Sequence, residues 1–256
     1  MTQPTAALII IGNEVLSGRT QDANLKFLAT RLGELGIPLR EVRVIPDVPE
    51  TIIGTVNEIR VRFTYVFTTG GIGPTHDDIT SECVARAFGV PWEVHEPSRA
   101  IMEADYARRS PPVTMNPARL RMATLPRGAT PILCAETSAP GFAIGNVHVM
   151  AGVPRIMRSM FEVVAPTLQG GTPVKSRAVH AHGLLEGTIA EALTAVQNRF
   201  PQLDIGSYPY YREGGNGVAL VAKGTDEAAL EAAAAEIAAL IRADGKEPVP
   251  GEPAAA

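Results

Sequence analysis

The stretch Thr68-Thr69-Gly70-Gly71-Ile72-Gly73-Pro74-Thr75-His76-Asp77-Asp78-Ile79-Thr80 decides how the first half of this chain folds. It joins an apolar segment to a helix and places several glycines directly before a pair of carboxylates. Glycines lack a Cβ, so their backbone N–H groups can converge on an anion, and the following helix adds its positive N-terminal end. The stretch therefore predicts a phosphate-binding turn between a strand and a helix.

The acidic pair Asp77 and Asp78 predicts a metal ion beside that phosphate. Unit charges about 4 Å apart repel by about 4 kcal/mol at an effective dielectric constant of about 20. A divalent cation removes this conflict, because Mg²⁺ is usually held by one or two carboxylates together with phosphate oxygens. Helix N-capping is the alternative role for one of the aspartates. Glu82, in the first turn of the predicted helix, suits either the helix dipole or the metal.

Short apolar strands alternate with amphipathic helices around this turn. Strands are predicted over 6–11, 39–44 and 65–68, and helices follow the first and second of these strands. This order is typical of an α/β fold, with a mostly parallel sheet that carries helices on both faces. Ligands of such sheets bind outside the carboxyl ends of the strands, and Glu14 follows the first strand. We therefore expect Glu14 to face the same crevice as the glycine turn.

A change in composition at Gln169-Gly170-Gly171-Thr172-Pro173 divides the chain into two domains. The first covers residues 1–170. The second, over 174–244, is predicted as a small α+β domain with the order strand, helix, strand, strand, helix. The remainder, 245–256, is rich in Pro and Ala and is predicted to be disordered.

Composition excludes several classes of function. A net charge of −4 disfavours binding to duplex nucleic acid, which needs a basic face. Cys83 and Cys134 are too few for a disulfide framework or a zinc site, and we expect both to be reduced and buried, which favours the cytoplasm. The first apolar run, 6–11, is too short for a signal peptide or a membrane span, so no membrane association is expected.

Several segments resemble the competence/damage-inducible protein A (CinA) family, whose N-terminal domain is of the molybdopterin-binding MoaB/Mog type. In the family's order these are Ile11-Gly12-Asn13-Glu14-Val15-Leu16-Ser17-Gly18, Asn24, Thr69 through Thr80, Asn116-Pro117, Ala139-Pro140-Gly141-Phe142 and Gly152-Val153-Pro154. The resemblance implies a MoaB/Mog-like three-layer domain followed by a small α+β domain. It also implies a homo-oligomer, either a dimer or a trimer.

The function implied by the resemblance is metal-dependent hydrolysis of ADP-ribose or a related nucleotide diphosphate, with Mg²⁺, Mn²⁺ or Co²⁺. Two alternatives remain: a non-catalytic module that binds molybdopterin or a nucleotide, and a molybdopterin adenylyltransferase. Full-length members continue into an amidohydrolase domain, so deamidation of nicotinamide mononucleotide is not expected of this chain. His76 stands where a Lys is common, and a reference pKa near ~6.5 leaves it only partly charged at neutral pH.

The candidate site residues form two sets. The catalytic set is Asp77, Asp78 and Glu82, with the metal held by Asp77 and Asp78. The set that binds phosphate or ligand is Glu14, Asn24, Thr69, Gly70, Gly71, Gly73, Thr75, Thr80, Asn116, Arg119, Gly152 and Pro154. Some have a structural alternative, since Asn24 and Thr80 are good helix caps and Arg119 is of a type common at surfaces. The expected partner is a small nucleotide or pterin phosphate.

Overall fold

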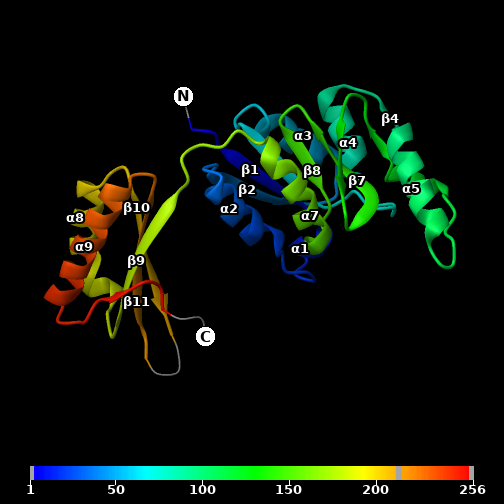
Figure 1. Ribbon diagram of the computed structural model, residues 1–256. Coiled ribbons are helices and arrows are strands. Elements are labelled where there is room, and N and C mark those ends of the chain that lie inside the picture. Colours follow the sequence, from blue (N-terminus) through cyan, green and yellow to red (C-terminus); the bar gives the residue numbers. More distant parts are fainter. Residues whose placement is uncertain (1–2, 212–214, 254–256) are drawn as a thin grey trace. The chain divides into compact units, whose positions relative to one another are not determined.

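The computed structural model describes residues 3–211 and 215–253 and divides the chain into two compact units, Met1–Gly171 and Thr172–Ala256 (Figure 1). The division falls within the linker that composition predicts over 169–173. Each unit has its own sheet and its own hydrophobic core.

A six-stranded sheet in the order β2-β1-β3-β8-β7-β6 forms the centre of the first unit. Its strands are β1 (Ala6–Ile11), β2 (Leu39–Ile45), β3 (Tyr65–Thr69), β6 (Thr130–Cys134), β7 (Thr137–Ile144) and β8 (Val147–Met150). Strands β2, β1, β3 and β8 pair in parallel, whereas β7 runs antiparallel to both of its neighbours. The sheet is therefore mostly parallel, and the carboxyl ends of β1, β3 and β8 meet at one edge.

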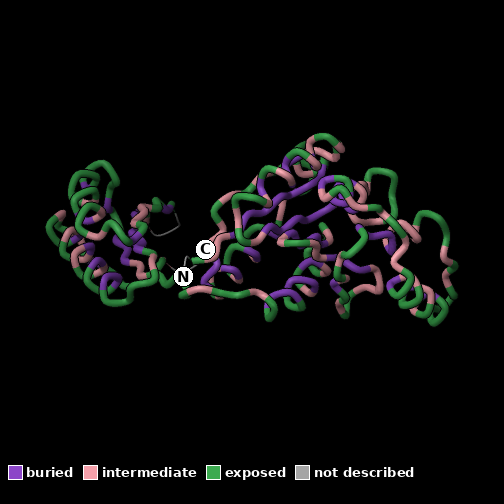
Figure 2. Tube along the Cα trace, turned by 90° about the horizontal axis from the view of Figure 1, so that it is seen from above, coloured by how far each residue is buried: buried purple, intermediate pink, exposed green. Residues whose placement is uncertain are grey.

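Helices cover both faces of this sheet, which confirms the predicted fold class. Helices α2 (Asn24–Glu34) and α7 (Pro154–Val164) pack on one face, and α3 (Pro49–Ile59) and α4 (Thr80–Phe88) pack on the other. Every residue of β1 is buried, because alternate side chains enter opposite cores. This explains why β1 is an unbroken apolar run. Figure 2 colours the chain trace by burial, with the buried residues in purple.

The segment between α4 and β6 forms a small arm that the sequence patterns did not assign. It contains β4 (Trp92–Val94), α5 (Glu96–Arg108), α6 (Pro117–Arg121) and β5 (Thr124–Pro126), and β4 pairs with β5. Met102, Tyr106 and Ala123 are buried in a separate small core there. A further short helix, α1 (Asn13–Leu16), follows β1, and a 3-10 turn, η1 (Ala165–Thr167), follows α7.

The second unit is a four-stranded antiparallel sheet in the order β10-β11-β9-β12 with two helices. Its elements are β9 (Lys175–His182), α8 (Glu186–Arg199), β10 (Asp204–Tyr210), β11 (Gly217–Gly224), α9 (Glu227–Ala243) and β12 (Val249–Pro250). The core lies between the helices and one face of the sheet. This is the small α+β arrangement that the sequence predicts.

The expected disorder over 245–256 needs correction. Val249–Pro250 pairs with β9, and the Gly251 N–H donates a hydrogen bond to the Ala178 carbonyl at 2.8 Å. Residues 249–251 are ordered because they form backbone hydrogen bonds with the edge of β9. The amino-acid composition of the segment gives no sign of this pairing. Residues 254–256 lie outside the described residues.

Two further expectations concern the burial of the cysteines and membrane association. Both cysteines are free thiols, but only Cys83 is buried, whereas Cys134 is half-buried. Burial raises the pKa of the Cys83 thiol to about 11 because the thiolate would lose its hydration. Within residues 3–211 and 215–253, no helix combines the length and the apolar character that crossing a bilayer requires.

The buried imidazole of His148 predicts a loss of stability in mild acid. His148 is 8% exposed, and its ring stacks on Phe67 with the ring centroids 5.1 Å apart. Burial lowers the pKa of His148, since the charged ring would be desolvated. Below about pH 6.5 the unfolded chain therefore binds a proton that the folded chain does not, and stability present above that pH is lost as the pH falls.

We expect this one group to lower the free energy of unfolding by up to about 1.4 kcal/mol for each pH unit below about pH 6. Denaturant unfolding at pH 7 and pH 5 measures the slope, and His148→Phe is expected to reduce it. A variant with the same pH dependence as the unmodified protein would contradict the assignment to His148.

Candidate functional site

The glycine turn connects the end of β3 to the start of α4 in a conformation that requires glycine. Gly70 and Gly71 have φ angles of 101° and 68°, in the region that side chains disfavour. A Cβ on Gly70 would lie 2.1 Å from the carbonyl oxygen of Ile11, and a Cβ on Gly71 would lie 2.2 Å from Thr80 Oγ1. The turn therefore packs directly against the end of β1 and the first turn of α4.

Thr80 stabilises the turn through two hydrogen bonds. Its buried hydroxyl donates to the Gly70 carbonyl at 3.0 Å, and its N–H donates to the Gly71 carbonyl at 2.9 Å. By contrast, the N–H groups of Gly71, Ile72 and Gly73 donate no hydrogen bond within the described residues. Thr80 thus has a structural role, while the turn keeps several backbone donors for a ligand.

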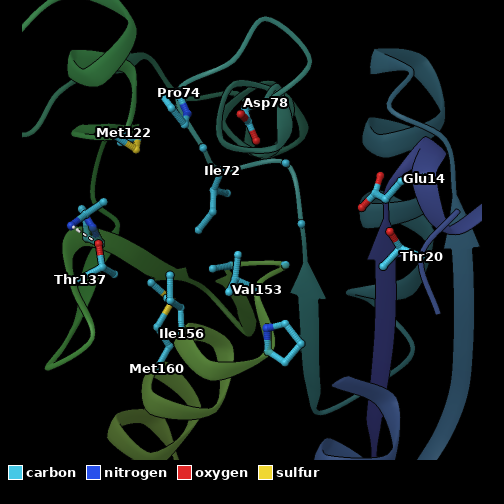
Figure 3. A pocket seen from close by; sticks show the side chains of 18 residues that line it. Glu14, Thr20, Ile72, Pro74, Asp78, Met122, Thr137, Val153, Ile156 and Met160 are labelled. Atoms are coloured by element: carbon cyan, nitrogen blue, oxygen red, sulfur yellow. Dashed lines mark hydrogen bonds between the residues drawn. The ribbon is translucent and has the colours of Figure 1, made fainter. Parts of the chain in front are cut away.

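A cavity of about 550 Å³ lies against this turn (Figure 3). Its lining comes from the segments that follow β1, β3 and β8, from Met122 after α6, from β7 and from α7. The apolar part includes Ile72, Met122, Val153, Ile156 and Met160, and the charged part is Glu14 and Asp78. In Figure 3 the side chains of Ile72 and Val153 point toward one another, with Asp78 and Glu14 at separate positions around them.

Thr75 positions both aspartates of the turn. Asp78 Oδ2 accepts a hydrogen bond from the Thr75 N–H at 2.8 Å and lies 2.6 Å from Thr75 Oγ1, which also contacts Asp77 Oδ1. A hydroxyl has one proton, so Thr75 Oγ1 donates to only one carboxylate at a time. Its hydrogen bond is the main reason why the pKa of Asp77 is lowered. Asp78 lines the cavity, whereas Asp77 is exposed and does not.

Glu14 reaches the cavity from α1, the short helix that follows β1. A Cβ on Gly12 would lie 2.5 Å from both carboxylate oxygens of Glu14, so the glycine lets this carboxylate fold back over the end of β1. The α1 segment is held by the Asn13 N–H, which donates to Asp47 Oδ2 at 2.8 Å. Glu14 consequently approaches the glycine turn from the segment after β1, whereas Asp78 belongs to the turn itself.

The structure brings together about half of the predicted site residues. Those that line the cavity are Glu14, Gly70, Gly71, Gly73, Asp78, Gly152 and Pro154. Asn24 and Thr69 line a smaller pocket beside it. Thr75 and Thr80 support the turn without lining the cavity. Among the described residues, no three His, Cys, Asp or Glu side chains are grouped as a ready-made metal site.

The remaining predictions correspond to other roles. Asn116 Oδ1 accepts from the Arg119 N–H at 2.9 Å and caps α6. The Arg119 guanidinium donates to the Thr114 carbonyl at 2.7 Å and lies 5.7 Å from the centre of the Tyr106 ring. Glu82 is half-buried on α4 and does not line the cavity. The His76 side chain is 98% exposed, so it is not directed into the site.

Sequence reasoning missed the apolar wall of the cavity and named Arg119, not Arg121, as the arginine that binds the ligand. Ile156 and Met160 are four residues apart on α7, and this spacing directly after Gly152-Val153-Pro154 was the available signal. Arg121 Nη2 donates to the Asp78 carbonyl at 3.2 Å, and its Cζ lies 5.0 Å from the centre of the Trp92 ring. Arg121, rather than Arg119, is therefore the arginine next to the turn.

Comparison with known families identifies both units. A model described as a probable molybdopterin binding domain matches residues 7–170. This chain belongs to the molybdopterin-binding-domain family. A second model, described as the middle domain of FAD synthase, matches residues 174–249 and hence the small α+β unit. The glycine turn and its cavity lie within the molybdopterin-binding domain.

Individual relatives support the resemblance to CinA. A protein from Pyrobaculum calidifontis is 36% identical over 214 residues, which cover 80% of this chain and 81% of the relative. A CinA-like protein from Desulfosudis oleivorans is 36% identical over 211 residues, 78% of this chain but 51% of that relative, so the chain spans about half of its length. The crystal structure of CinA from Thermoplasma acidophilum is 30% identical with a TM-score of 0.60, covering 64% of this chain and 98% of that one. The chain is thus CinA-like in its molybdopterin-binding domain.

Proposed function

We propose that this protein hydrolyses the diphosphate of ADP-ribose, or of a related nucleotide, with the help of a divalent cation. The supporting observation is that Asp78 and Glu14 line one cavity against a glycine turn with unused N–H donors. Backbone donors at a helix N-terminus suit phosphate, and carboxylates beside them suit a cation. A cavity of about 550 Å³ is within the usual range for a ligand of this size.

The side chains present fit a hard cation such as Mg²⁺, Mn²⁺ or Co²⁺. Asp78 offers carboxylate oxygens, and phosphate oxygens and water would complete the ligand set, with Glu14 in the same cavity. When bound, such a cation neutralises the diphosphate and makes phosphorus more open to attack. Asp78, whose carboxylate accepts a hydrogen bond from the Thr75 N–H, would hold the cation. Asp77 and Glu82 have no direct role in this proposal.

The reaction itself is addition of water to one phosphorus and cleavage of its bond to the bridging oxygen, which yields AMP and ribose 5-phosphate. The N–H groups of Gly71, Ile72 and Gly73 bind the phosphate oxygens where negative charge gathers. Glu14 accepts the proton of the attacking water. The planar base lies against Ile72, Val153 and Ile156. These apolar side chains exclude water but do not discriminate between one kind of ring and another.

A second candidate function is binding of molybdopterin or a nucleotide without chemistry. It is favoured by the family match and by the exposed position of Asp77, which leaves one aspartate fewer in the cavity than the sequence predicts. Tight pterin binding without hydrolysis of any diphosphate would select this candidate. Molybdopterin adenylylation would instead release pyrophosphate only when ATP and molybdopterin are both present.

Release of AMP from ADP-ribose tests the leading proposal. Purified protein is incubated with ADP-ribose and Mg²⁺, Mn²⁺ or Co²⁺, and AMP is followed by chromatography. We expect release with at least one metal and none when excess chelator is present, because the diphosphate is then not neutralised. Protein that is shown to be folded and that releases no AMP with any of the metals would contradict hydrolysis.

A further inference from the structure

A small side pocket of about 60 Å³ adjoins the main cavity. Glu14, Thr20, Gly70, Gly152 and Pro154 line both spaces. The side pocket is enclosed by the ends of β1 and β3, the start of α2 and the turn between β8 and α7. A ligand in the cavity can therefore extend one polar group into it.

Two buried oxygen atoms of the residues lining this pocket have no hydrogen-bond partner. Asn24 is 3% exposed and Thr69 is 1% exposed. Asn24 Nδ2 donates to the Gly152 carbonyl at 2.9 Å, which fixes the orientation of the amide and leaves Oδ1 without a partner. Thr69 Oγ1 also has none. A buried polar group left unpaired costs about 1–3 kcal/mol, so two at one pocket point to a ligand that pairs with them.

The charges around the side pocket indicate which chemical group that is. Glu14 and Asp22 contribute carboxylates, and none of the described residues that line the pocket is basic. Asn24 Oδ1 and the carboxylates are hydrogen-bond acceptors only, while Thr69 and Thr20 can accept or donate. Such a lining suits a group that donates hydrogen bonds, which phosphate oxygens without protons cannot do.

We propose that the side pocket binds a neutral hydrogen-bond donor of the ligand, a sugar hydroxyl or a ring amine, while the phosphates stay at the glycine turn. Asn24 Oδ1 and Thr69 Oγ1 then gain hydrogen-bond partners in the complex. The inference rests on the proposed function for the position of the phosphates. For ADP-ribose the donors would be hydroxyls of the terminal ribose.

Thr68 provides a matched control for Thr69. Its Oγ1 is likewise buried and unpartnered, and it precedes Thr69 in β3. Successive strand residues point to opposite faces, and Thr68 does not line the side pocket. Thr68→Val and Thr69→Val therefore each remove one unpaired hydroxyl, and the two hydroxyls lie on opposite faces of the same strand. Neither change should lower the melting temperature, because no hydrogen bond within the described residues is lost.

Calorimetric titration with non-hydrolysable ligands tests the proposal. The probes are the α,β-methylene analogues of ADP-ribose and ADP, each with Mg²⁺, together with inorganic pyrophosphate and pterin-6-carboxylate. We expect Thr69→Val to weaken binding of the ADP-ribose analogue about tenfold, with Thr68→Val unchanged, since one hydrogen bond to the terminal ribose is lost. Binding of the ADP analogue and of pyrophosphate should be the same in both variants.

A tenfold loss confined to pterin-6-carboxylate would also support the proposal and would identify the donor as a ring amine. Equal affinities of the two variants for every probe would overturn it. So would an equal loss of pyrophosphate binding in Thr69→Val, a melting temperature lowered in that variant alone, or failure of all probes to bind the unmodified protein. Because these readouts are affinities, lack of AMP release would count against hydrolysis and not against the side pocket.

Discussion

Asp78→Asn is expected to lower kcat/KM for ADP-ribose about 100- to 1000-fold, whereas Asp77→Asn lowers it about tenfold or less. Both substitutions are isosteric and remove one negative charge. Both carboxylates contact Thr75 Oγ1, and Asp78 also accepts a hydrogen bond from the Thr75 N–H, which the amide oxygen of asparagine can still accept. Only Asp78 lines the cavity, and only its loss should remove the carboxylate that holds the cation beside the phosphates.

The comparison is made by AMP release over a range of Mn²⁺ concentrations. For Asp78→Asn we expect half-maximal activity to need much more Mn²⁺, while Asp77→Asn stays close to the unmodified protein. Circular dichroism establishes that both variants are folded. Equal losses in the two variants would mean that the turn, and not one carboxylate, determines activity. Undiminished turnover in Asp78→Asn would remove the metal from this position.

Gly70→Ala is expected to lower the free energy of unfolding of the first unit by about 3–5 kcal/mol, an effect as large as that of a major core truncation. The new Cβ would lie 2.1 Å from the carbonyl oxygen of Ile11, the last residue of β1, an interior strand that pairs with β2 and β3 and cannot move without displacing them. The φ angle of 101° adds backbone strain.

Gly18→Ala separates these two causes. Gly18 has a φ angle of 72°, but a Cβ there meets no atom within 4 Å. We expect this variant to lose only about 1–2 kcal/mol, the cost of the conformation itself. Urea unfolding followed by circular dichroism compares the two. A loss in Gly70→Ala no larger than that in Gly18→Ala would show that the turn does not press against β1 as described.

Much of the fold was predictable because it follows local periodicity. The six buried residues of β1 are a continuous apolar run, and the apolar stripes of α2 and α3 predict which faces pack on the sheet. The arm between α4 and β6 was missed because α5 buries few of its residues and lacks a strong apolar stripe. The position of β12 was missed because an edge pairing depends on backbone groups, which composition does not reveal.

The site was predictable where its residues belong to the glycine turn itself. The conformation of this segment is local, because it is set by the φ angles of its glycines and by the hydrogen bonds of Thr75 and Thr80. Its predicted site residues are Thr69, Gly70, Gly71, Gly73, Thr75 and Asp78. Asn116 and Arg119 do not line the cavity. Their side chains instead form local hydrogen bonds within the segment around α6. The side pocket was not predictable, because it assembles Asn24, Thr69 and Gly152 from distant parts of the chain. The expected dimer or trimer stays a prediction.

A crystal structure with Mn²⁺ and the α,β-methylene analogue of ADP-ribose would test the proposed diphosphate site most directly. We expect an anomalous Mn²⁺ peak within coordinating distance, about 2–2.3 Å, of an Asp78 carboxylate oxygen. The diphosphate should accept hydrogen bonds from the N–H groups of Gly71, Ile72 or Gly73. A diphosphate bound away from the glycine turn, or a Mn²⁺ ion that contacts neither Asp78 nor the diphosphate, would contradict it.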